Sequence, residues 1–356
     1  MKMPDAALVV TADDSTGATE AGASCADAGW RVEVVPYYVA SSAAECVVVD
    51  LRSRHVPPLE ARRRTIALAT DARHVHKIDS TLRGNWAAEL SALVEIGRRV
   101  VLVPSHPPLG RVCVGGVVLV DGVPVAETEH GNDPRMPVHT SRPSDWLTGI
   151  ELASVELAGA EEFAAWIAGS DQAVAIVDAS TLADIEQIVA VALDAVDVVI
   201  AGPASVVGAV ARACAPRKSS PLPLPWLPAP VVAVCASLHS ASRSQMAALA
   251  ASGLDVEVAM SPDDRAGDAD AIAVELAGRA HRLVGELQAR SVILVGGDTA
   301  AAFIGDAAVA VYGSVGVGIS LGEATFGRRR LRLACKPGGF GTTNTLVDLV
   351  KRGMQR

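Results

Sequence analysis

The sequence predicts an α/β protein of two α/β domains with largely parallel sheets and an active-site cleft between the domains. Short apolar segments rich in Val, Ile and Ala alternate with helical patterns, which is typical of buried parallel strands. The chain has 356 residues, more than the roughly 250 to 300 at which a single core stops growing. Hydrophobic residues make up 50% but aromatic residues only 3%. The core is therefore expected to consist of aliphatic side chains.

The first part of the chain opens with a βαβ pattern. We expect a strand over 7–12, a helix over 16–29 and a strand over 31–39. The further expected elements are strands at 46–50, 75–78, 100–104, 172–177 and 198–201, helices at 59–71, 84–96, 182–193 and after Gly202-Pro203, and a hairpin at 117–125 about Asp121-Gly122.

A Pro-rich segment separates this part from the second. Because such segments join domains, we expect domains at 1–217 and 231–356 with a linker at 218–230. The expected elements of the second domain are strands at 231–235, 255–259, 291–295 and 331–335, and helices at 242–252, 269–288, within 296–305 and at 345–352.

Composition excludes several classes of protein. A net charge of -9 gives no basic field for duplex nucleic acid. The start of the chain lacks the apolar region of a signal peptide, and prolines rule out a membrane helix in the longest uncharged run, 219–242. The cysteines form no C-x-x-C pair, which argues against structural zinc and for a reducing compartment. We therefore expect a cytoplasmic protein that binds neither nucleic acid nor membrane; the cysteines are Cys25, Cys46, Cys113, Cys214, Cys235 and Cys335.

Asp13 and Asp14 lie between the first expected strand and the first expected helix. Ligands bind at the carboxyl edge of open α/β sheets, which is where both carboxylates fall. A carboxylate there can accept the proton of a substrate hydroxyl or hold the hydroxyl in line, as the base of a kinase does. Asp14 or Ser15 would equally suit a helix cap, and the pair alone leaves both interpretations open.

The segment from His76 to Asn85 follows another expected strand and is dense in polar side chains. Arg83 offers a planar fork for a carboxylate, Lys77 a point charge and Asp79 an acceptor for hydroxyls, a set that fits a polyhydroxy acid. The alternative is a solvated loop with a helix capped by a hydroxyl side chain. The candidate substrate-binding residues are Lys77, Asp79, Ser80, Arg83, Asn85 and, from the loop at 104–111, Arg111, beside which His106 is interpreted as structural or positioning.

Three loops of the second domain could bind phosphate. Amides at the start of a helix after Gly296-Gly297 can cradle an anion, and Lys336 brings a cation to glycines that allow close backbone approach. Neither a G-x-x-x-x-G-K-[ST] loop nor a G-x-G-x-x-G after a strand occurs, which excludes P-loop kinases and standard dinucleotide folds. The candidate nucleotide-binding residues are Ser237, Gly296, Gly297, Asp298, Thr299, Lys336, Gly338 and Gly339.

With these motifs in this order, the chain resembles the four-carbon acid sugar kinase family, which includes D-threonate, D-erythronate and 3-oxo-tetronate kinases. The resemblance covers nearly the whole chain, and the string from Lys77 to Asn85 is its most specific part. It implies that residues 1–217 hold the sugar acid, that 231–356 hold ATP, and that Asp13 and Asp14 are catalytic. Mg²⁺ is implied by phosphoryl transfer from ATP. Its ligands are not identified, and a homo-oligomer is left open.

The leading hypothesis is therefore an ATP-dependent kinase that phosphorylates a hydroxyl of a short sugar acid. Two alternatives stay open. One is a kinase of a different small hydroxylated acceptor. The other is a non-catalytic protein that binds a sugar acid or a nucleotide, because Ala236 and Pro337 stand where the family usually has Gly and Ser.

Overall fold

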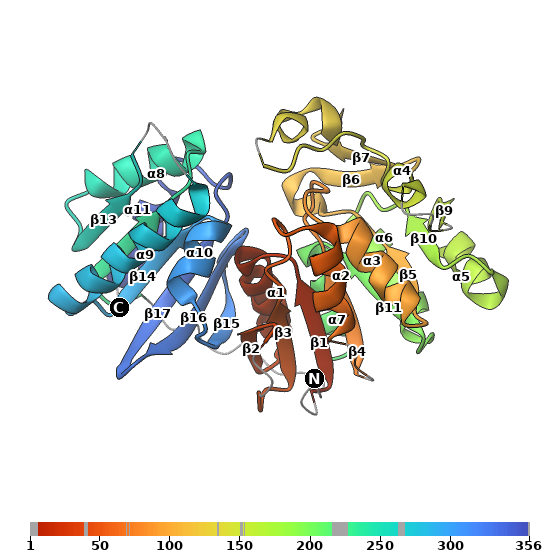
Figure 1. Ribbon diagram of the computed structural model, residues 1–356, viewed down its shortest axis with the longest axis horizontal. Helices are drawn as coiled ribbons and strands as arrows, with labels where there is room; N and C mark the ends of the chain where they lie inside the picture. Colours follow the sequence, from red (N-terminus) through yellow and green to blue (C-terminus); the bar gives the residue numbers. More distant parts are fainter. Residues whose placement is uncertain are drawn as a thin grey trace.

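The computed structural model describes residues 6–38, 42–68, 70, 72–133, 135–149, 152, 154–215, 227–262 and 268–354. Within these ranges the strands of both parts of the chain form one 14-stranded sheet, with the order β13-β12-β14-β17-β16-β15-β2-β3-β1-β4-β11-β5-β10-β9. A separate sheet has the order β6-β7-β8. The N-terminal half (residues 6–215) and the C-terminal half (residues 227–354) lie side by side (Figure 1).

All strands that the N-terminal half contributes to the large sheet run parallel. The segment Leu8–Ala12 is buried along its length, as expected of a parallel strand covered on both faces. The strands are β1 (Leu8–Ala12), β2 (Val32–Pro36), β3 (Cys46–Asp50), β4 (Arg73–Lys77), β5 (Arg99–Leu102), β9 (Ser154–Leu157), β10 (Val174–Val177) and β11 (Val198–Gly202). The helices are α1 (Ser15–Asp27), α2 (Pro58–Ile66), α3 (Trp86–Glu95), α4 (Pro143–Thr148), α5 (Ala160–Gly169), α6 (Leu182–Leu193) and α7 (Ala204–Ala213).

The small sheet belongs to an excursion between β5 and α4, which lies beyond the carboxyl ends of β5 and β11 at the top right of Figure 1. The expected hairpin about Asp121-Gly122 is confirmed, with φ of 50° and 83° at the two residues. The excursion consists of η1 (Pro107–Leu109), β6 (Arg111–Val114), β7 (Val117–Val120), β8 (Val123–Pro124), η2 (Val125–Glu127) and η3 (Glu129–Asn132). Strand β6 was not expected, because the prolines and glycine before it indicated only a loop.

In the C-terminal half, four strands pair in parallel in the order β13-β12-β14-β17, and next to β17 in the sheet lies an antiparallel hairpin of β16 and β15. The strands are β12 (Val231–Cys235), β13 (Val256–Met260), β14 (Ser291–Val295), β15 (Val309–Gly316), β16 (Ile319–Phe326) and β17 (Arg329–Lys336), and the helices are α8 (Ser240–Ala250), α9 (Ala269–Glu286), α10 (Gly297–Ile304) and α11 (Thr345–Met354). The hairpin of β15 and β16 was not expected. Glycine disfavours strands, and Gly313, Gly316, Gly318 and Gly322 interrupt the alternation that would have revealed them.

Strands β2 and β15 join the two halves. They pair antiparallel, with Val34 opposite Val309 and Val32 opposite Val311. Helix α1 lies across this junction (Figure 1), and a Cβ atom on Gly22 would be 3.2 Å from both Val34 and Val311. The missing side chain therefore allows α1 to pack closely on strands from both halves.

Most expected elements occur within a few residues of their expected ends, although the helix expected over 59–71 ends at Ile66. Helices α4 and α5 and strand β9 were not expected. The domain limits at 217 and 231 stay a prediction, and most of the expected linker at 218–230 lies outside the described residues. In the parts of the chain that the structure describes, none of the helices combines the length and apolar character needed to cross a bilayer.

Candidate active site

Asp13 and Asp14 follow β1 and lie at the carboxyl edge of the sheet, beside the junction of the two halves. Both carboxylates bind the guanidinium of Arg54, from the loop after β3. Asp13 accepts bonds from Arg54 Nε at 2.7 Å and from Nη2 at 3.0 Å, and Asp14 Oδ1 accepts one from Nη2 at 2.9 Å. One buried cation thus holds the two carboxylates together.

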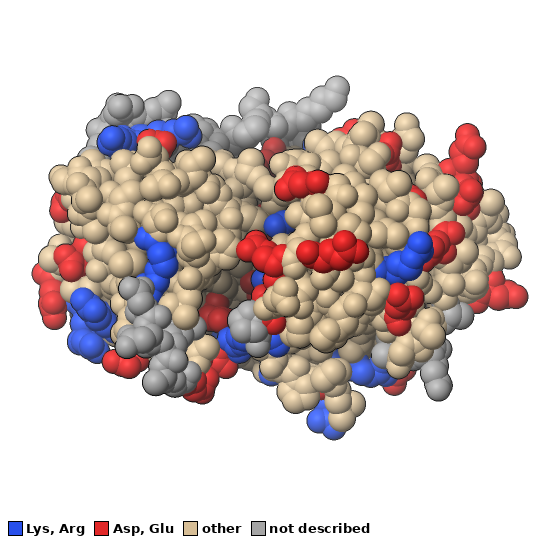
Figure 2. Space-filling view, turned by 90° about the horizontal axis from the view of Figure 1, so that it is seen from above, with Lys and Arg blue, Asp and Glu red and all other residues tan. Residues whose placement is uncertain are grey.

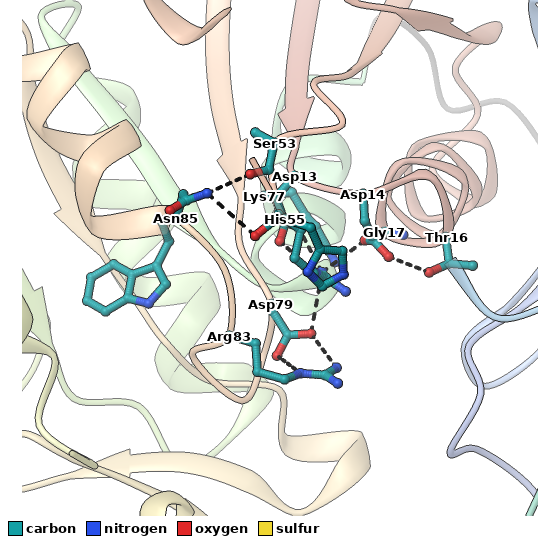
Figure 3. Close-up of polar contacts among 12 residues, drawn as sticks. Asp13, Asp14, Thr16, Gly17, Ser53, His55, Lys77, Asp79, Arg83 and Asn85 are labelled. Atoms are coloured by element: carbon teal, nitrogen blue, oxygen red, sulfur yellow. Dashed lines mark hydrogen bonds and ion pairs between the residues drawn. The ribbon is translucent and has the colours of Figure 1, made fainter. Parts of the chain in front are cut away.

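Asp14 also caps α1, so the two interpretations drawn from the sequence are compatible in this geometry. Its Oδ1 accepts a hydrogen bond from Gly17 N at 2.9 Å, and its Oδ2 accepts one from the Thr16 hydroxyl at 2.7 Å (Figure 3). Ser15 instead donates a hydrogen bond to Asp50, which ends β3. The cap fixes the carboxylate of Asp14 at the first turn of the helix.

The two carboxyl groups differ in acidity. Burial raises the pKa of Asp13 above its ordinary value, although Arg54 opposes the shift. For Asp14, burial also opposes ionisation, but Arg54, Lys77 and the bond from Thr16 together lower the pKa. Asp14 is therefore the better candidate for a carboxylate that stays ionised at neutral pH.

The loop after β4 holds a second pair of charges. Asp79 accepts a hydrogen bond from Arg83 Nη2 at 2.9 Å (Figure 3). It also accepts one from Thr81 N at 2.8 Å and lies 3.5 Å from Arg54 Nη2. Arg83 also reaches Asp133 of the excursion, at 3.2 Å. Burial disfavours the charge on Asp79, but Arg83 and Arg54 outweigh it and hold the pKa of this carboxyl well below its usual range.

Three further candidate substrate-binding residues, Asn85, Lys77 and Ser80, each have partners of their own. The Nδ2 of Asn85 donates to the carbonyl of Ser53 at 2.7 Å (Figure 3). It also donates to the carbonyl of Val56 at 2.8 Å, so Asn85 shapes the loop that carries Arg54. Lys77 ends β4, is 4% exposed, and places Nζ 3.8 Å from Glu20 Oε2 of α1. Ser80 accepts a hydrogen bond from Arg111 Nη1 at 2.6 Å.

The loops after β12, β14 and β17 come together in the C-terminal half. Thr299 Oγ1 in α10 accepts a hydrogen bond from Ala236 N at 2.9 Å, which ties the first two loops. A Cβ atom on Gly296 would be 3.6 Å from Ser237 Cβ, and one on Gly338 would be 3.2 Å from Ser237 Oγ. Three of the expected nucleotide-binding segments thus form one surface around Ser237.

The side chain of Lys336 points into the protein, whereas a phosphate-binding lysine would present its ammonium group to the ligand. Its side chain is fully buried, and Nζ donates to the carbonyls of Pro337 at 2.7 Å and Gly338 at 3.3 Å. Burial lowers the pKa of Lys336 to about 8. In this structure Lys336 therefore shapes the glycine loop from behind.

The two groups of loops face each other. A Cβ atom on Gly297, the first residue of α10, would be 2.6 Å from Asp14 Oδ2. Arg135 of the excursion donates to Asp298 Oδ2 at 3.0 Å and to Asp270 Oδ1 at 3.0 Å, and the Arg111 guanidinium lies 5.1 Å from the ring centre of Phe340. The N-terminal half thus touches the C-terminal loops at several points.

A cavity of about 480 Å³ lies between the halves. Helices α1 and α7 and the turn between β15 and β16 form its walls. Seen from above, the surface is hollowed between the halves, with charged side chains near the rim (Figure 2). The residues that line the cavity include Glu20, Ser24, Asp27, His106, Ser205, Arg212, Ser314 and Ser320.

Sequence reasoning missed two arginines of this site. Arg54 follows β3, so the strand-end rule that selected Asp13 could have found it, but one arginine in an otherwise ordinary loop gives a weak signal. Arg135 reaches Asp298 across 163 positions of sequence, and no local pattern marks such a contact. In the described ranges no group of three or more His, Cys, Asp or Glu side chains is arranged to hold a metal ion.

Fold and site together define a two-part α/β protein in which an acid-rich strand edge faces glycine loops suited to phosphate. Comparison with known proteins then identifies the family to which the chain belongs. Residues 8–210 match the model of the sugar-binding N-terminal domain.

Among characterised relatives, the chain is 29% identical to the D-threonate kinase of Bordetella bronchiseptica, over 95% of each chain. It is 32% identical to the D-erythronate kinase of Heliobacterium modesticaldum, over 42% of this chain and 37% of that one. A crystal structure of a domain of unknown function from Bordetella bronchiseptica, with bound citrate and described as a domain-swapped dimer, covers 98% of this chain and 99% of that one, with 27% identity and a TM-score of 0.53. The resemblance drawn from the motifs is confirmed, and the chain belongs to the four-carbon acid sugar kinase family.

Proposed function

We propose that this protein is an ATP-dependent kinase that transfers the γ-phosphoryl group of ATP to a hydroxyl of a four-carbon sugar acid. The observation that carries the proposal is the contact between Asp14 and Gly297. It brings a carboxylate of the sugar-binding half directly against the helix start that is suited to phosphate. A phosphoryl group held at α10 and a hydroxyl held at Asp14 would be neighbours.

Asp14 would act as an acceptor that orients the hydroxyl. Phosphoryl transfer passes through a loose transition state in most analyses, so the protein contributes mainly position and charge stabilisation. The lowered pKa of Asp14 suits this role, because an ionised carboxylate accepts a hydrogen bond from the hydroxyl before transfer. Asp13 would hold Arg54, and Arg54 would hold Asp14 in place.

The C-terminal loops would hold the nucleotide. The first turn of α10 offers backbone N–H groups that have no partner within the helix, and its dipole favours an anion. Ser237 and Gly338 lie beside this turn and leave room for phosphate oxygens. We assign Lys336 the role of supporting the loop, because its ammonium group points at carbonyls.

Mg²⁺ would accompany the phosphates, and the part of the chain that the structure describes has no group of three or more carboxylates, His or Cys arranged for it. Mg²⁺ in kinases is held by one or two carboxylates together with phosphate oxygens, so a cluster of protein ligands is not required. Asp14, which touches Gly297, and Asp298, whose side chain is 42% exposed in the first turn of α10, fit this requirement. When bound, Mg²⁺ would neutralise charge on the phosphates.

The non-catalytic alternative rests on Ala236 and Pro337. The amide of Ala236 is bound to Thr299 Oγ1, so it does not serve a phosphate here. Pro337 has no N–H, and its carbonyl accepts a bond from Lys336. Both residues therefore have structural roles that leave the start of α10 open, which favours the active enzyme.

An ADP-release screen with Mg-ATP and D-threonate, D-erythronate or 3-oxo-tetronate tests the proposal. We expect ADP formation that depends on one of the acids. Calorimetry with Mg-ATP narrows the alternatives: no binding at millimolar ATP would favour the non-catalytic protein. Binding of ATP without acid-dependent ADP formation would call for a wider screen of hydroxylated acceptors, in which ADP formation indicates another acceptor and none indicates a non-catalytic nucleotide-binding protein. We further propose a homo-oligomer, since a related crystal structure is described as a domain-swapped dimer, and light scattering on the purified chain tests it.

A further inference from the structure

The loop from 106 to 111 places two basic side chains together. His106 N donates to Arg111 O at 2.7 Å, and Arg111 N donates to His106 O at 3.3 Å, which closes the loop as an antiparallel bridge. Residues directly opposite in such a bridge carry their side chains on the same side. The imidazole of His106 and the guanidinium of Arg111 are therefore neighbours.

Each of these side chains has a buried nitrogen without a partner. Arg111 Nε and His106 Nε2 are enclosed, and neither forms a hydrogen bond with any described residue. Another nitrogen of each side chain holds it in place: Arg111 Nη1 donates to Ser80 Oγ, and His106 Nδ1 lies 2.5 Å from Ser205 Oγ. Buried polar atoms are rarely left unpaired, so two neighbouring ones mark a place where a polar ligand could bind.

Arg111 differs from the other arginines around the site in its ion pairs. Arg54 has carboxylates of three residues within 3.5 Å, and Arg83 and Arg135 each have two within 3.2 Å. Arg111 has no ion pair with any residue that the structure describes. Phe340 of the C-terminal half covers its guanidinium and is itself wedged against Gly318, where a Cβ atom would be 2.5 Å from the ring.

The same loop borders the cavity between the halves. His106 and Ser205 belong to its lining, together with Glu20 and Ser320. Its volume of about 480 Å³ falls in the range of small-molecule sites, roughly 300 to 1,000 Å³. Glu20 links the cavity to the candidate active site, because it lies 3.8 Å from Lys77 Nζ.

On the basis of the proposed function, we propose that Arg111 and His106 bind the carboxylate of the acceptor acid, with Phe340 closing over it. The free Nε edge of Arg111 offers the fork that matches a carboxylate, and His106 Nε2 can donate a second bond when Nδ1 accepts from Ser205. Arg83, which the sequence suggested for this role, is paired with Asp79 and Asp133 and would position Asp79 instead.

The surroundings suit a neutral imidazole beside a charged guanidinium. Burial, together with Arg111 and Lys77, lowers the pKa of His106 to about 3, so this ring adds no second charge near neutral pH. The pair of Arg111 and His106 would therefore carry a single positive charge, which matches a monocarboxylate. Sugar acids would be distinguished from the corresponding polyols by this group.

Calorimetry without nucleotide tests the inference on the full chain. The probes are D-threonate, D-erythronate and 3-oxo-tetronate, with D-threitol as an uncharged comparison. Arg111→Gln should weaken binding of the best acid by about 10- to 100-fold, the range for loss of a hydrogen bond to a charged group. It should leave binding of D-threitol and Mg-ATP within about 2-fold, a change worth less than 1 kcal/mol.

Arg142→Gln is the matched control, because Arg142 pairs with Glu156 at the surface and is absent from the cavity lining. If Arg111→Gln fails to fold, Arg111→Lys, which keeps the charge without the fork, should still bind the acid more weakly than the wild type. Unchanged acid binding in a folded Arg111 variant, or equal loss for acid and D-threitol, would overturn the inference, as would wild-type protein that binds none of the acids. Acid binding that depends on Arg111, without phosphorylation, would instead contradict the proposed function alone.

Discussion

Asp14 of the N-terminal half lies directly against Gly297 of the C-terminal half. A Cβ atom on Gly297 would be 2.6 Å from Asp14 Oδ2 and 3.5 Å from Thr16 Oγ1. Glycine is thus the residue that lets the capped carboxylate of α1 approach the first turn of α10. The proposed phosphoryl transfer depends on this approach.

Gly297→Ala should therefore disrupt catalysis more than folding. The added methyl group must push Asp14 away or open the contact, and displacements of about 1 Å can cost on the order of 100-fold in rate. We expect kcat to fall about 10- to 100-fold. Gly285→Ala is the control, since Gly285 is in α9 and, apart from its neighbours in that helix, no atom of the described residues lies within 4 Å of a Cβ there. Equal kcat values for the two variants would show that the contact does not matter.

Arg54→Gln should reduce both activity and stability. Removing the cation leaves Asp13, Asp14 and Asp79 buried without their shared partner, and breaking a buried ion pair costs about 3 to 5 kcal/mol. Arg63→Gln, on the exposed face of α2, should leave the unfolding free energy within about 0.5 kcal/mol of the wild type. Chemical denaturation at pH 7 measures both differences.

The stability loss in Arg54→Gln should shrink as the pH falls. In the wild type the pKa values of Asp14 and Asp79 are lowered, so their contribution is present above the unfolded pKa and is lost as pH falls through the folded values. In the variant the unpaired carboxyls would take up protons on folding, which makes it relatively more stable in acid. A difference that stays constant as the pH falls from 7 to about 3 would contradict this account.

Asp50 should give an opposite pH dependence. Burial raises the pKa of Asp50 from 3.8 to about 6, although the bond from Ser15 opposes the shift. A raised pKa means stability that is full below the unfolded pKa and is lost as pH rises through about 6. Relative to Asp50→Asn, the wild type should lose roughly 3 kcal/mol between pH 4 and pH 7, at about 1.4 kcal/mol per pKa unit. Parallel stability curves for the two proteins would disprove the shift.

Arg135→Gln should weaken ATP binding with little effect on folding. Arg135 and its partners Asp298 and Asp270 are partly exposed, and such pairs contribute about 0 to 1 kcal/mol. Without the guanidinium, Asp298 loses the partner that holds its carboxylate in place, and the start of α10 loses a nearby positive charge; we therefore expect the KM for ATP to rise about 10-fold, less at high salt. The KM for the acid should not change, and Arg142→Gln is again the control. A rise in the acid KM alone would assign Arg135 to the other substrate.

Local patterns predicted the parallel strands and the carboxylates at their ends. The segment from Leu8 to Asp14 shows why, because a buried strand followed by a helix cap is readable from seven neighbouring residues. The hairpin of β15 and β16 was not readable, since its glycines mask the strand pattern. The contact of Asp14 with Gly297 depends on pairing between β2 and β15, which no local signal reveals.

The roles of single cations were the least predictable part of the site. The sequence suggested Arg83 and Lys336 as ligand-binding cations, but both have partners within the protein. Arg83 pairs with Asp79 and Asp133, and Lys336 donates to backbone carbonyls. Which cation stays available depends on the three-dimensional arrangement of carboxylates. Arg111 was among the candidate substrate-binding residues, but preferring it to Arg83 as the carboxylate ligand required knowledge of the neighbours of both.

Transfer of labelled phosphate from γ-³²P-ATP to D-threonate, D-erythronate or 3-oxo-tetronate, by wild-type protein and Asp14→Asn, tests the central claim most directly. The account predicts a labelled sugar-acid phosphate with the wild type. It also predicts a loss of at least about 100-fold with Asp14→Asn, the scale of general acid–base groups, in a variant whose circular dichroism shows that it is still folded at the assay temperature. Labelled product at the wild-type rate from Asp14→Asn, or no labelled acid from the wild type with any of the three, would contradict it.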